Sequence, residues 1–405
     1  MARGSAESFD VRLHGLPVGH LHFQNGLTTF EFRDDYRGLA DRPVLGQVFE
    51  QDPGRRWRQA QRVPVWFSNL LPEDGPLLEF LSEELDVSPK SEMRLLEALG
   101  QDLPGAVTVT HSRGGSGTVL DGDTEEPPEH EDAGIRFSVA GVQLKLSMVR
   151  DDNTLRLGGG DERGSFYVKF AGSFAAVPEN EYAMMRLAGL SGITVPEIDL
   201  LDGTSLRDLP PSFARYTKTR AFLVRRFDRT PDGAVHIEDM SQVSGSWPER
   251  KYQGVSYEGL GRVVRALCGD EDLLEYIRRL AFCVLIGNED AHLKNWSVMY
   301  PNRRQPRLTP AYDLVSTIHY EGLDRGLALP LGGSTNPEVV RLDSFSALAD
   351  ASAYEGAEDP VEAVRAVVAG YREAVTQVRT DSPLADDFWL RLEAYQSRLS
   401  LTADV

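Results

Sequence analysis

The sequence of 405 residues contains little cysteine and no long apolar run. Its two cysteines, Cys268 and Cys283, lie in apolar sequence with helical periodicity, which favours buried thiols in a reducing cytoplasm. So few thiols, beside eight scattered histidines, argue against a zinc site. No apolar stretch approaches the length of a membrane span, and the N-terminal MARGSAESFD lacks the apolar core of a signal peptide. We therefore expect a cytoplasmic protein that does not enter a membrane.

Basic charge is also scarce, because 43 lysines and arginines face 62 aspartates and glutamates, for a net charge of −19. Proteins that bind nucleic acid directly need a basic surface that displaces counterions from the phosphates. The composition therefore argues against direct binding of nucleic acid by the whole surface. A local basic patch or a basic partner protein would be needed for contact with DNA.

Residues 1–110 are predicted to form a small α+β unit. Two apolar-alternating runs, VRLHGLPVGHLHF and LTTFEF, flank Asn25-Gly26, a dipeptide typical of tight β-hairpin turns. Apolar residues at helical spacing predict a helix over Leu77–Leu85. A second helix is predicted to run to Leu99, with Ser88 as its N-cap and Pro89 in its first turn.

The rest of the chain divides into three stretches by composition. Residues 111–134 are rich in glycine, serine, threonine and acidic residues, which predicts a flexible loop. Residues 135–255 are rich in predicted strands with one inserted helix, ENEYAMMRLAGLSG, an order typical of the small lobe of a kinase. Residues 256–405 are predicted to be mainly α-helical, apart from a hairpin around WSVMY and RLTPAYD.

The most informative segment is GNEDAHLKN, residues 287–295, which we interpret as the catalytic loop of an ATP-dependent kinase. Asp290 and Asn295 have the spacing of the D-x-x-x-x-N element of protein kinases. There the aspartate accepts the proton of the attacking hydroxyl, and the asparagine amide oxygen binds Mg²⁺. Asp313, which follows the predicted hairpin, is the expected second metal ligand.

Two other residues of this loop are candidates for catalysis. Lys294 is predicted to neutralise the γ-phosphate, and His292 to brace the loop through hydrogen bonds. Any one of these polar residues alone would more often be an ordinary turn former. Their order after a predicted helix, Asp272–Ile286, and around a predicted hairpin favours the catalytic interpretation.

A candidate phosphate-binding turn, SVAGVQLK, lies between two strand-like runs at residues 138–145. A small turn that contains glycine lets backbone N–H groups approach phosphate oxygens. With one glycine it matches neither a Walker A loop nor G-x-G-x-x-G, and a plain β-hairpin explains it equally well. The predicted nucleotide contacts of this turn are Ser138, Val139, Ala140, Gly141, Gln143 and Lys145.

Lys169, on the predicted strand FYVKF, is placed where kinases reach the α- and β-phosphates, with Glu181 as its expected partner. Arg225 and Phe227, at the end of a later strand, would form the hinge beside adenine. Each has an alternative explanation. A strand lysine is usually solvated, an acid near a helix start suits the helix dipole, and Phe227 could simply be core.

Taken in order, these motifs resemble the HipA family of toxin kinases over nearly the whole chain. FSNLLPEDG resembles the signature of its N-terminal domain; SVAGVQLKLS, YVKF, ENEY, RRFDR, HIEDMSQ, IGNEDAHLKNWS and LTPAYDLVST then follow in the family's order. The resemblance implies an α+β, two-lobed kinase-like fold that uses ATP and Mg²⁺. It further implies a serine/threonine kinase that phosphorylates an aminoacyl-tRNA synthetase, and a HipB-like helix-turn-helix antitoxin as partner.

By position, the resemblance makes Asp290 the catalytic base, Asn295 and Asp313 the metal ligands, and Lys169 a nucleotide contact. Ser138 matches the family's autophosphorylated serine, where a phosphate would add charge to the turn that closes over ATP. Two alternatives stay open at this point. One is a small-molecule or phosphoinositide-like kinase on the same scaffold, and the other is a non-catalytic binding module.

Overall fold

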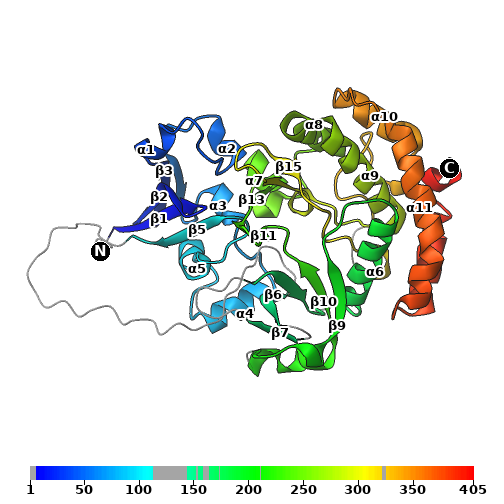
Figure 1. The fold of residues 1–405 in the computed structure, drawn as a ribbon, viewed down its shortest axis with the longest axis horizontal. Coiled ribbons are helices and arrows are strands. Elements are labelled where there is room, and N and C mark those ends of the chain that lie inside the picture. Colours follow the sequence, from blue (N-terminus) through cyan, green and yellow to red (C-terminus); the bar gives the residue numbers. More distant parts are fainter. Residues whose placement is uncertain are drawn as a thin grey trace, which may run out of the picture.

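The computed structural model describes residues 6–112, 144–151, 154–157, 164–172, 174–209, 211–321 and 325–405. The chain forms three regions (Figure 1): an N-terminal unit in blue and cyan, a sheet with helix α6 in green, and a helical lobe that ends in orange and red. Most of the predicted phosphate-binding turn lies outside the described residues. This part is residues 138–143, which include Ser138, Val139, Ala140, Gly141 and Gln143. Most of the predicted acidic loop 111–134 lies outside them too.

The N-terminal unit is built on a five-stranded antiparallel sheet in the order β4-β3-β2-β1-β5. Asn25 and Gly26 have φ of 51° and 75°, so the predicted hairpin turn is present. The run VRLHGLPVGHLHF contains a second turn, since His14 and Gly15 have φ of 51° and 78°. The strands are β1 (Glu7–Leu13), β2 (Leu16–Gln24), β3 (Leu27–Phe32), β4 (Trp57–Ala60) and β5 (Val107–His111).

Short helices complete the N-terminal unit, and one of them begins later than predicted. Ser91 N donates a hydrogen bond to Ser88 O at 3.0 Å, so Ser88–Ser91 forms a turn with Pro89 at its second position. Proline favours that position because its φ is already set for the turn. The helices are α1 (Asp34–Arg37), α2 (Gln47–Glu50), α3 (Val65–Ser68), α4 (Pro76–Glu84) and α5 (Glu92–Leu99).

The second region is an antiparallel sheet in the order β7-β6-β8-β10-β9. Side chains alternate across β10: Leu223 belongs to the core of the N-terminal unit, whereas Phe222 packs into the core of the helical lobe. This sheet therefore connects the other two regions. Its strands are β6 (Lys145–Asp151), β7 (Thr154–Leu157), β8 (Phe166–Lys169), β9 (Ile198–Asp202) and β10 (Arg220–Arg225), and helix α6 is Val177–Leu190.

The third region is mainly helical, as predicted, with α9 buried at its centre. α11 packs across α9 and α6 (Figure 1). The helices are α8 (Tyr257–Cys268), α9 (Asp270–Ile286), α10 (Leu342–Ala351), α11 (Pro360–Asp381), α12 (Asp386–Gln396) and α13 (Ser400–Ala403). Among the described residues, no helix combines the length and apolar character needed to cross a membrane.

The predicted hairpin beside the catalytic loop is part of a small sheet, β13-β14-β15. β14 (Ser297–Tyr300) and β15 (Arg307–Leu308) form the hairpin, and β13 (His236–Asp239) pairs with β14. The predicted division of the chain at residue 255 therefore crosses this sheet, because β13 and the following α7 (Met240–Ser244) contact the catalytic segment. Strand pairing over this sequence distance is not visible in local periodicity.

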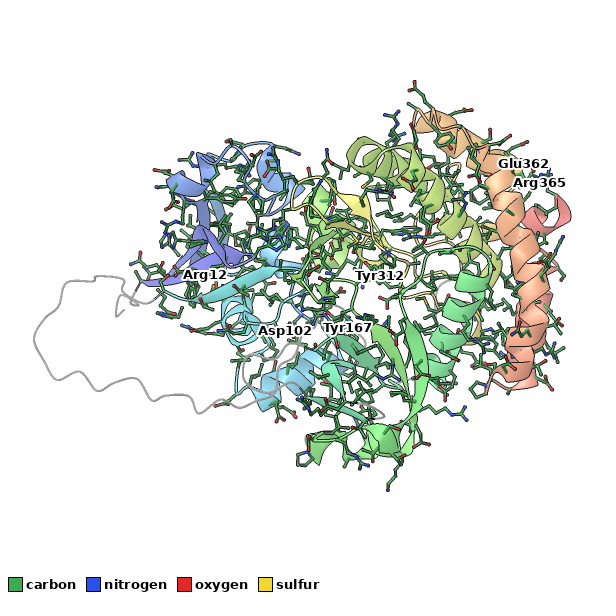
Figure 2. The ribbon with its side chains drawn as sticks, in the orientation of Figure 1. Arg12, Asp102, Tyr167, Tyr312, Glu362 and Arg365 are labelled. Carbon is green, nitrogen blue, oxygen red and sulfur yellow. The ribbon has the colours of Figure 1, made fainter. Side chains whose placement is uncertain are left out.

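A buried cluster of charges fastens the N-terminal unit to the end of β10. We call it the hinge cluster; it consists of Asp102, Arg226, Asp228 and Arg229. Asp228 accepts hydrogen bonds from both arginines and from Gly105 N at 2.8 Å. The Arg226 guanidinium lies 4.6 Å from the ring centroid of Tyr167, which is labelled near Asp102 in Figure 2.

Candidate active site

A cavity of about 1380 Å³ opens where the three regions meet. The N-terminal unit contributes Asn69 and Glu73 to its wall, and β6 and β8 contribute one lysine each. The helical lobe supplies the segment that follows α9. The cavity brings together these predicted site residues: Lys145, Lys169, Arg225, Phe227, Asp290, His292, Lys294, Asn295 and Asp313.

The loop conformation depends on Gly287, which ends α9 with φ of 61°. A Cβ at this position would lie 2.5 Å from Ile318 Cγ2, so both the backbone and the space require glycine. Asn288 then fixes the loop, because its Oδ1 accepts from Asp290 N at 3.1 Å and its Nδ2 donates to Asp313 O at 3.4 Å. The two segments that carry the predicted catalytic and metal-binding residues are thereby held side by side.

Asp290 and Asn295 are joined through the backbone of the loop. Asn295 Nδ2 donates to Asp290 O at 2.8 Å, which leaves the amide oxygen Oδ1 as the acceptor available to a cation. The Asp290 carboxylate accepts a hydrogen bond from the hydroxyl of Tyr252 through Oδ1. Burial raises the pKa of Asp290, while the hydrogen bond from Tyr252 acts in the opposite direction. A carboxylate in this state can accept a proton from a hydroxyl group.

The lysines of β6 and β8 form a second set of charges with Glu181 and Asp313, which we call the cleft cluster: Lys145, Lys169, Glu181 and Asp313. Lys169 Nζ donates to Glu181 Oε1 at 2.5 Å, so the predicted contact between them is present. Lys169 also donates to Asp313 Oδ1, and Lys145 lies beside Lys169 in the register of β6 and β8. Glu181 is buried within α6 rather than at its first residue.

Asp313 has φ of 54°, the left-handed region that few residues other than glycine adopt. Such backbone conformations cluster at functional sites, where the surrounding structure holds them. Burial alone would disfavour its charge, but Lys169 and Lys145 outweigh burial and hold the pKa of Asp313 down at about 2. The carboxylate is therefore ionised at neutral pH, as a metal ligand must be.

The other charged members of the cleft cluster respond mainly to burial. Burial raises the pKa of Glu181 to about 7, although Lys169 opposes the shift. Burial lowers the pKa of Lys145 to about 8, with Asp313 acting to raise it. For Lys169, the carboxylates of Asp313 and Glu181 outweigh burial and raise the pKa. Lys169 is therefore a permanent cation at the floor of the cavity.

His292 and Lys294 have surroundings that differ from those predicted. The His292 ring is buried, which lowers its pKa to about 3, and its Nδ1 has no hydrogen-bond partner among the described residues. Its backbone braces the loop instead, since His292 N donates to Asp290 O at 2.8 Å. Lys294 Nζ donates to Asn69 O at 2.9 Å and lies 3.3 Å from Asp239 Oδ2. Its ammonium group thus contacts the N-terminal unit and the N-cap of α7 at the cavity wall, and its role beside the γ-phosphate stays a prediction.

The predicted hinge residues lie along one edge of the cavity. Arg225 N donates to Glu197 O at 2.8 Å, and the Arg225 side chain forms an ion pair with Glu197 at 3.2 Å. Phe227 is half-buried, with its ring centroid 5.8 Å from that of Tyr312. Phe227 is thus part of the cavity wall, and its contact with adenine stays a prediction.

The residues of the cavity fit a nucleotide with Mg²⁺. No group of three or more histidines, cysteines or acids is placed to hold a metal ion in the part of the chain that the structure describes. Asn295 and Asp313 offer an amide oxygen and an ionised carboxylate from adjacent segments. Mg²⁺ typically takes one or two such protein oxygens and completes its shell with phosphates and water. Lys169 supplies a cation for the phosphates.

Several residues of the site were not found from the sequence. Tyr252 contacts Asp290 across a sequence separation of 38 residues, and Asn69 contacts Lys294 across 225. FSNLLPEDG was recognised only as part of a family pattern, although it contains Asn69 and Glu73 of the cavity wall. Asn288 offered a local signal, since an asparagine directly after a helix-ending glycine often bonds the backbone two residues on.

Comparisons with known proteins point to one family over most of the chain. A family model described as the HipA N-terminal domain matches residues 9–110, and one described as the HipA-like C-terminal domain matches residues 137–378. A putative kinase of Sinorhizobium fredii is 41% identical over 88% of this chain and 90% of its own length. The serine/threonine-protein kinase toxin HipA of Shewanella oneidensis is 27% identical over 86% of this chain and 84% of its own.

A solved structure of the Shewanella oneidensis toxin–antitoxin system, HipA with HipB and operator DNA, has the same fold. It matches with a TM-score of 0.72 and 24% identity over 97% of this chain and 96% of the other. The predicted two-lobed, kinase-like α+β fold is thereby confirmed. The order of the motifs, the two family models and the 41% identical relative together place this chain in the HipA family.

Proposed function

We propose that the protein is a serine/threonine protein kinase that acts as the toxin of a HipBA-type toxin–antitoxin pair. The observation that carries the proposal is the convergence of Lys169, Asp290, Asn295 and Asp313 on one cavity. A binding module without catalysis has no need of all four groups in this arrangement. The relative from Shewanella oneidensis, which is named a serine/threonine-protein kinase toxin, supports both the activity and the role.

Each group has a distinct task in the proposed reaction. ATP, bound with Mg²⁺, would supply the γ-phosphoryl group and leave as ADP. Asp290 accepts the proton of the attacking hydroxyl, and its backbone carbonyl orients Asn295. Asn295 Oδ1 and Asp313 would hold the metal, while Lys169, fixed by Glu181, would neutralise phosphate charge. Lys294, bonded to Asn69, holds the loop against the N-terminal unit.

The proposed substrate is an aminoacyl-tRNA synthetase, whose phosphorylation would stop tRNA charging, translation and growth. The proposed partner is a HipB-like helix-turn-helix antitoxin. The solved relative was crystallised with HipB and operator DNA, which supports such a partner. A net charge of −19 suits an indirect contact with DNA through a basic partner better than direct binding.

Labelled ATP tests the activity and its substrate together. Purified protein and the Asp290→Ala variant are incubated with Mg²⁺, [γ-³²P]ATP and a panel of aminoacyl-tRNA synthetases. We expect the wild-type protein to label one synthetase and the variant to label none, with circular dichroism showing that both are folded. Equal labelling by the variant would refute Asp290 as the base. Transfer only to added phosphoinositides or small hydroxyl compounds would favour the alternative kinase class.

Self-labelling tests the proposed autophosphorylation of Ser138. We expect the wild-type protein to incorporate phosphate at Ser138 and the Ser138→Ala variant to incorporate none, while its affinity for ATP is retained. Mass spectrometry of peptides identifies the labelled residue. Label that persists in the Ser138→Ala variant would place the autophosphorylation site elsewhere.

A further inference from the structure

Tyr252 is the one side chain outside the catalytic loop that the structure shows hydrogen-bonded to the Asp290 carboxylate among the described residues. It lies in the segment between Pro248–Arg250 and α8, 38 residues before Asp290. The Tyr252 hydroxyl donates to Asp290 Oδ1. Asp290 Oδ2 is thus left to receive the proton of the substrate hydroxyl that becomes phosphorylated. Burial and the neighbouring Asp290 raise the pKa of Tyr252, so the phenol stays protonated and remains a donor at neutral pH.

Both side chains, those of Tyr252 and Asp290, are only partly enclosed, so neither needs the contact to satisfy a fully buried polar atom. Tyr252 is 45% exposed, so water could hydrogen-bond its hydroxyl if Asp290 were absent. The Asp290 side chain is 53% exposed and, without a fixed donor, would sample several rotamers. A catalytic base must be held close to one productive geometry, and small misplacements cost rate. The hydrogen bond therefore serves the orientation of Asp290 more than the stability of the fold.

Three contacts hold Tyr252 itself in place. Its ring meets the His292 ring edge-on, with centroids 5.0 Å apart. The preceding carbonyl, Lys251 O, accepts from Leu293 N of the catalytic loop at 3.2 Å. Lys251 Nζ donates to Glu73 Oε2 of the N-terminal unit at 2.7 Å. The N-terminal unit, the Lys251–Tyr252 segment and the catalytic loop thus form one connected wall on the acceptor side of the cavity.

We propose that Tyr252 is a positioning residue for phosphoryl transfer: its hydroxyl fixes the Asp290 carboxylate so that Oδ2 faces the incoming acceptor hydroxyl. The inference rests on the proposed kinase function and adds a residue that acts through Asp290. A residue that only orients the base affects the chemical step and leaves nucleotide binding as it was. Its effect also disappears when the base itself is removed, because the two groups act as a unit.

The test compares Tyr252→Phe, which removes only the hydroxyl and keeps the ring against His292, with the wild-type protein. Tyr354→Phe is the matched control, because Tyr354 bonds Glu358 O at 2.9 Å in a different part of the helical lobe. Rates of label transfer from [γ-³²P]ATP to the labelled synthetase, or to the protein itself, give kcat and KM for ATP. We expect kcat of Tyr252→Phe to fall about tenfold, with KM for ATP within about twofold.

The same substitution is then made in the Asp290→Ala background, with more protein and longer incubation so that residual transfer below the detection of the first assay is measured, and we expect that residual rate to be unchanged. If kcat of Tyr252→Phe equals that of the wild type, or falls only as much as kcat of Tyr354→Phe, the positioning role is overturned. The proposed kinase function is unaffected by either result. A tenfold loss that persists in the Asp290→Ala background would also overturn it, because Tyr252 would then act elsewhere. No transfer by the wild-type protein to any acceptor would overturn the kinase function and the positioning role with it.

Discussion

The hinge cluster and the cleft cluster contain the same kinds of side chain, yet they differ in how fully their charges are enclosed. In the hinge cluster, Asp228 is 2% exposed and both its carboxylate oxygens accept hydrogen bonds from Arg226. In the cleft cluster, the Asp313 side chain is 34% exposed and its backbone is left-handed. Each cluster has one buried polar atom without a hydrogen-bond partner among the described residues, Glu181 Oε2 in the cleft cluster and Arg229 Nε in the hinge cluster.

This difference separates a structural role from a functional one. Buried ion pairs such as those of the hinge cluster hold two parts of the chain together, even though Arg226 and Asp228 border the cavity, and the loss of one partner leaves the others uncompensated. A partly exposed carboxylate on a strained backbone at the cavity, as at Asp313, is organised for a ligand. We therefore expect substitutions in the hinge cluster to reduce stability and substitutions in the cleft cluster to reduce activity.

Asp313→Asn gives the largest expected effect. Asparagine tolerates the left-handed backbone, so the fold is retained, but the ionised ligand is lost. We expect the rate of phosphoryl transfer to fall about a thousandfold or more, while the free energy of unfolding falls by no more than about 2 kcal/mol, because the Asp313 side chain is 34% exposed and Glu181 still pairs with Lys169. Initial rates with [γ-³²P]ATP and urea unfolding measure the two quantities. Near-normal transfer by this variant would remove Asp313 from the metal site.

Asp228→Asn tests the expectation that the hinge cluster stabilises the fold. The change leaves Arg226 and Arg229 buried with one carboxylate, Asp102, in place of two. We expect the free energy of unfolding to fall by about 3–5 kcal/mol, as for other broken buried ion pairs. Urea unfolding followed by circular dichroism measures the loss. A variant of normal stability that has lost phosphoryl transfer would show that the hinge cluster has a catalytic role instead.

The loss of stability at acid pH also tests the structural role of the hinge cluster. Burial opposes the charge of Asp228, but Arg226 and Arg229 outweigh burial and lower its pKa below the ordinary value of 3.8. Below pH 3.8 the unfolded chain binds a proton that the folded chain does not, so stability falls as the pH drops toward the folded pKa. Over that window, stability of the wild type should fall more steeply than that of Asp228→Asn, by up to about 1.4 kcal/mol per pH unit. Parallel pH curves in urea unfolding would contradict this role.

The sequence predicted the elements whose signals are local. The helix before Gly287, the Asn25-Gly26 turn and the hairpin after the catalytic loop each follow from neighbouring residues, and all are present. The turn at His14-Gly15 was missed because histidine is not among the residues that usually mark a tight turn. Ser88-Pro89 was misread as a helix start because serine followed by proline also suits the opening of a turn.

Of the candidate site, the sequence identified groups whose spacing repeats a known chemical element. Asp290, Asn295 and Asp313 belong to one segment of chain, and the structure places them on one cavity. The surroundings of Lys294 and the contact between Tyr252 and Asp290 depend on the packing of the N-terminal unit and on a distant loop. No local pattern contains that information, because it arises only when the three regions assemble.

The most direct test of the comparison is the affinity for ATP in the presence of Mg²⁺, measured by isothermal titration. The proteins are the wild type, Lys169→Met from the cleft cluster and Asp228→Asn from the hinge cluster, at a temperature where all are folded. Lys90→Met, at an exposed site, is the control for loss of a lysine. We predict that Lys169→Met weakens ATP binding at least about tenfold, while Asp228→Asn and Lys90→Met stay within about twofold of the wild type. Unchanged affinity in Lys169→Met would contradict the account of the cleft cluster as a nucleotide site.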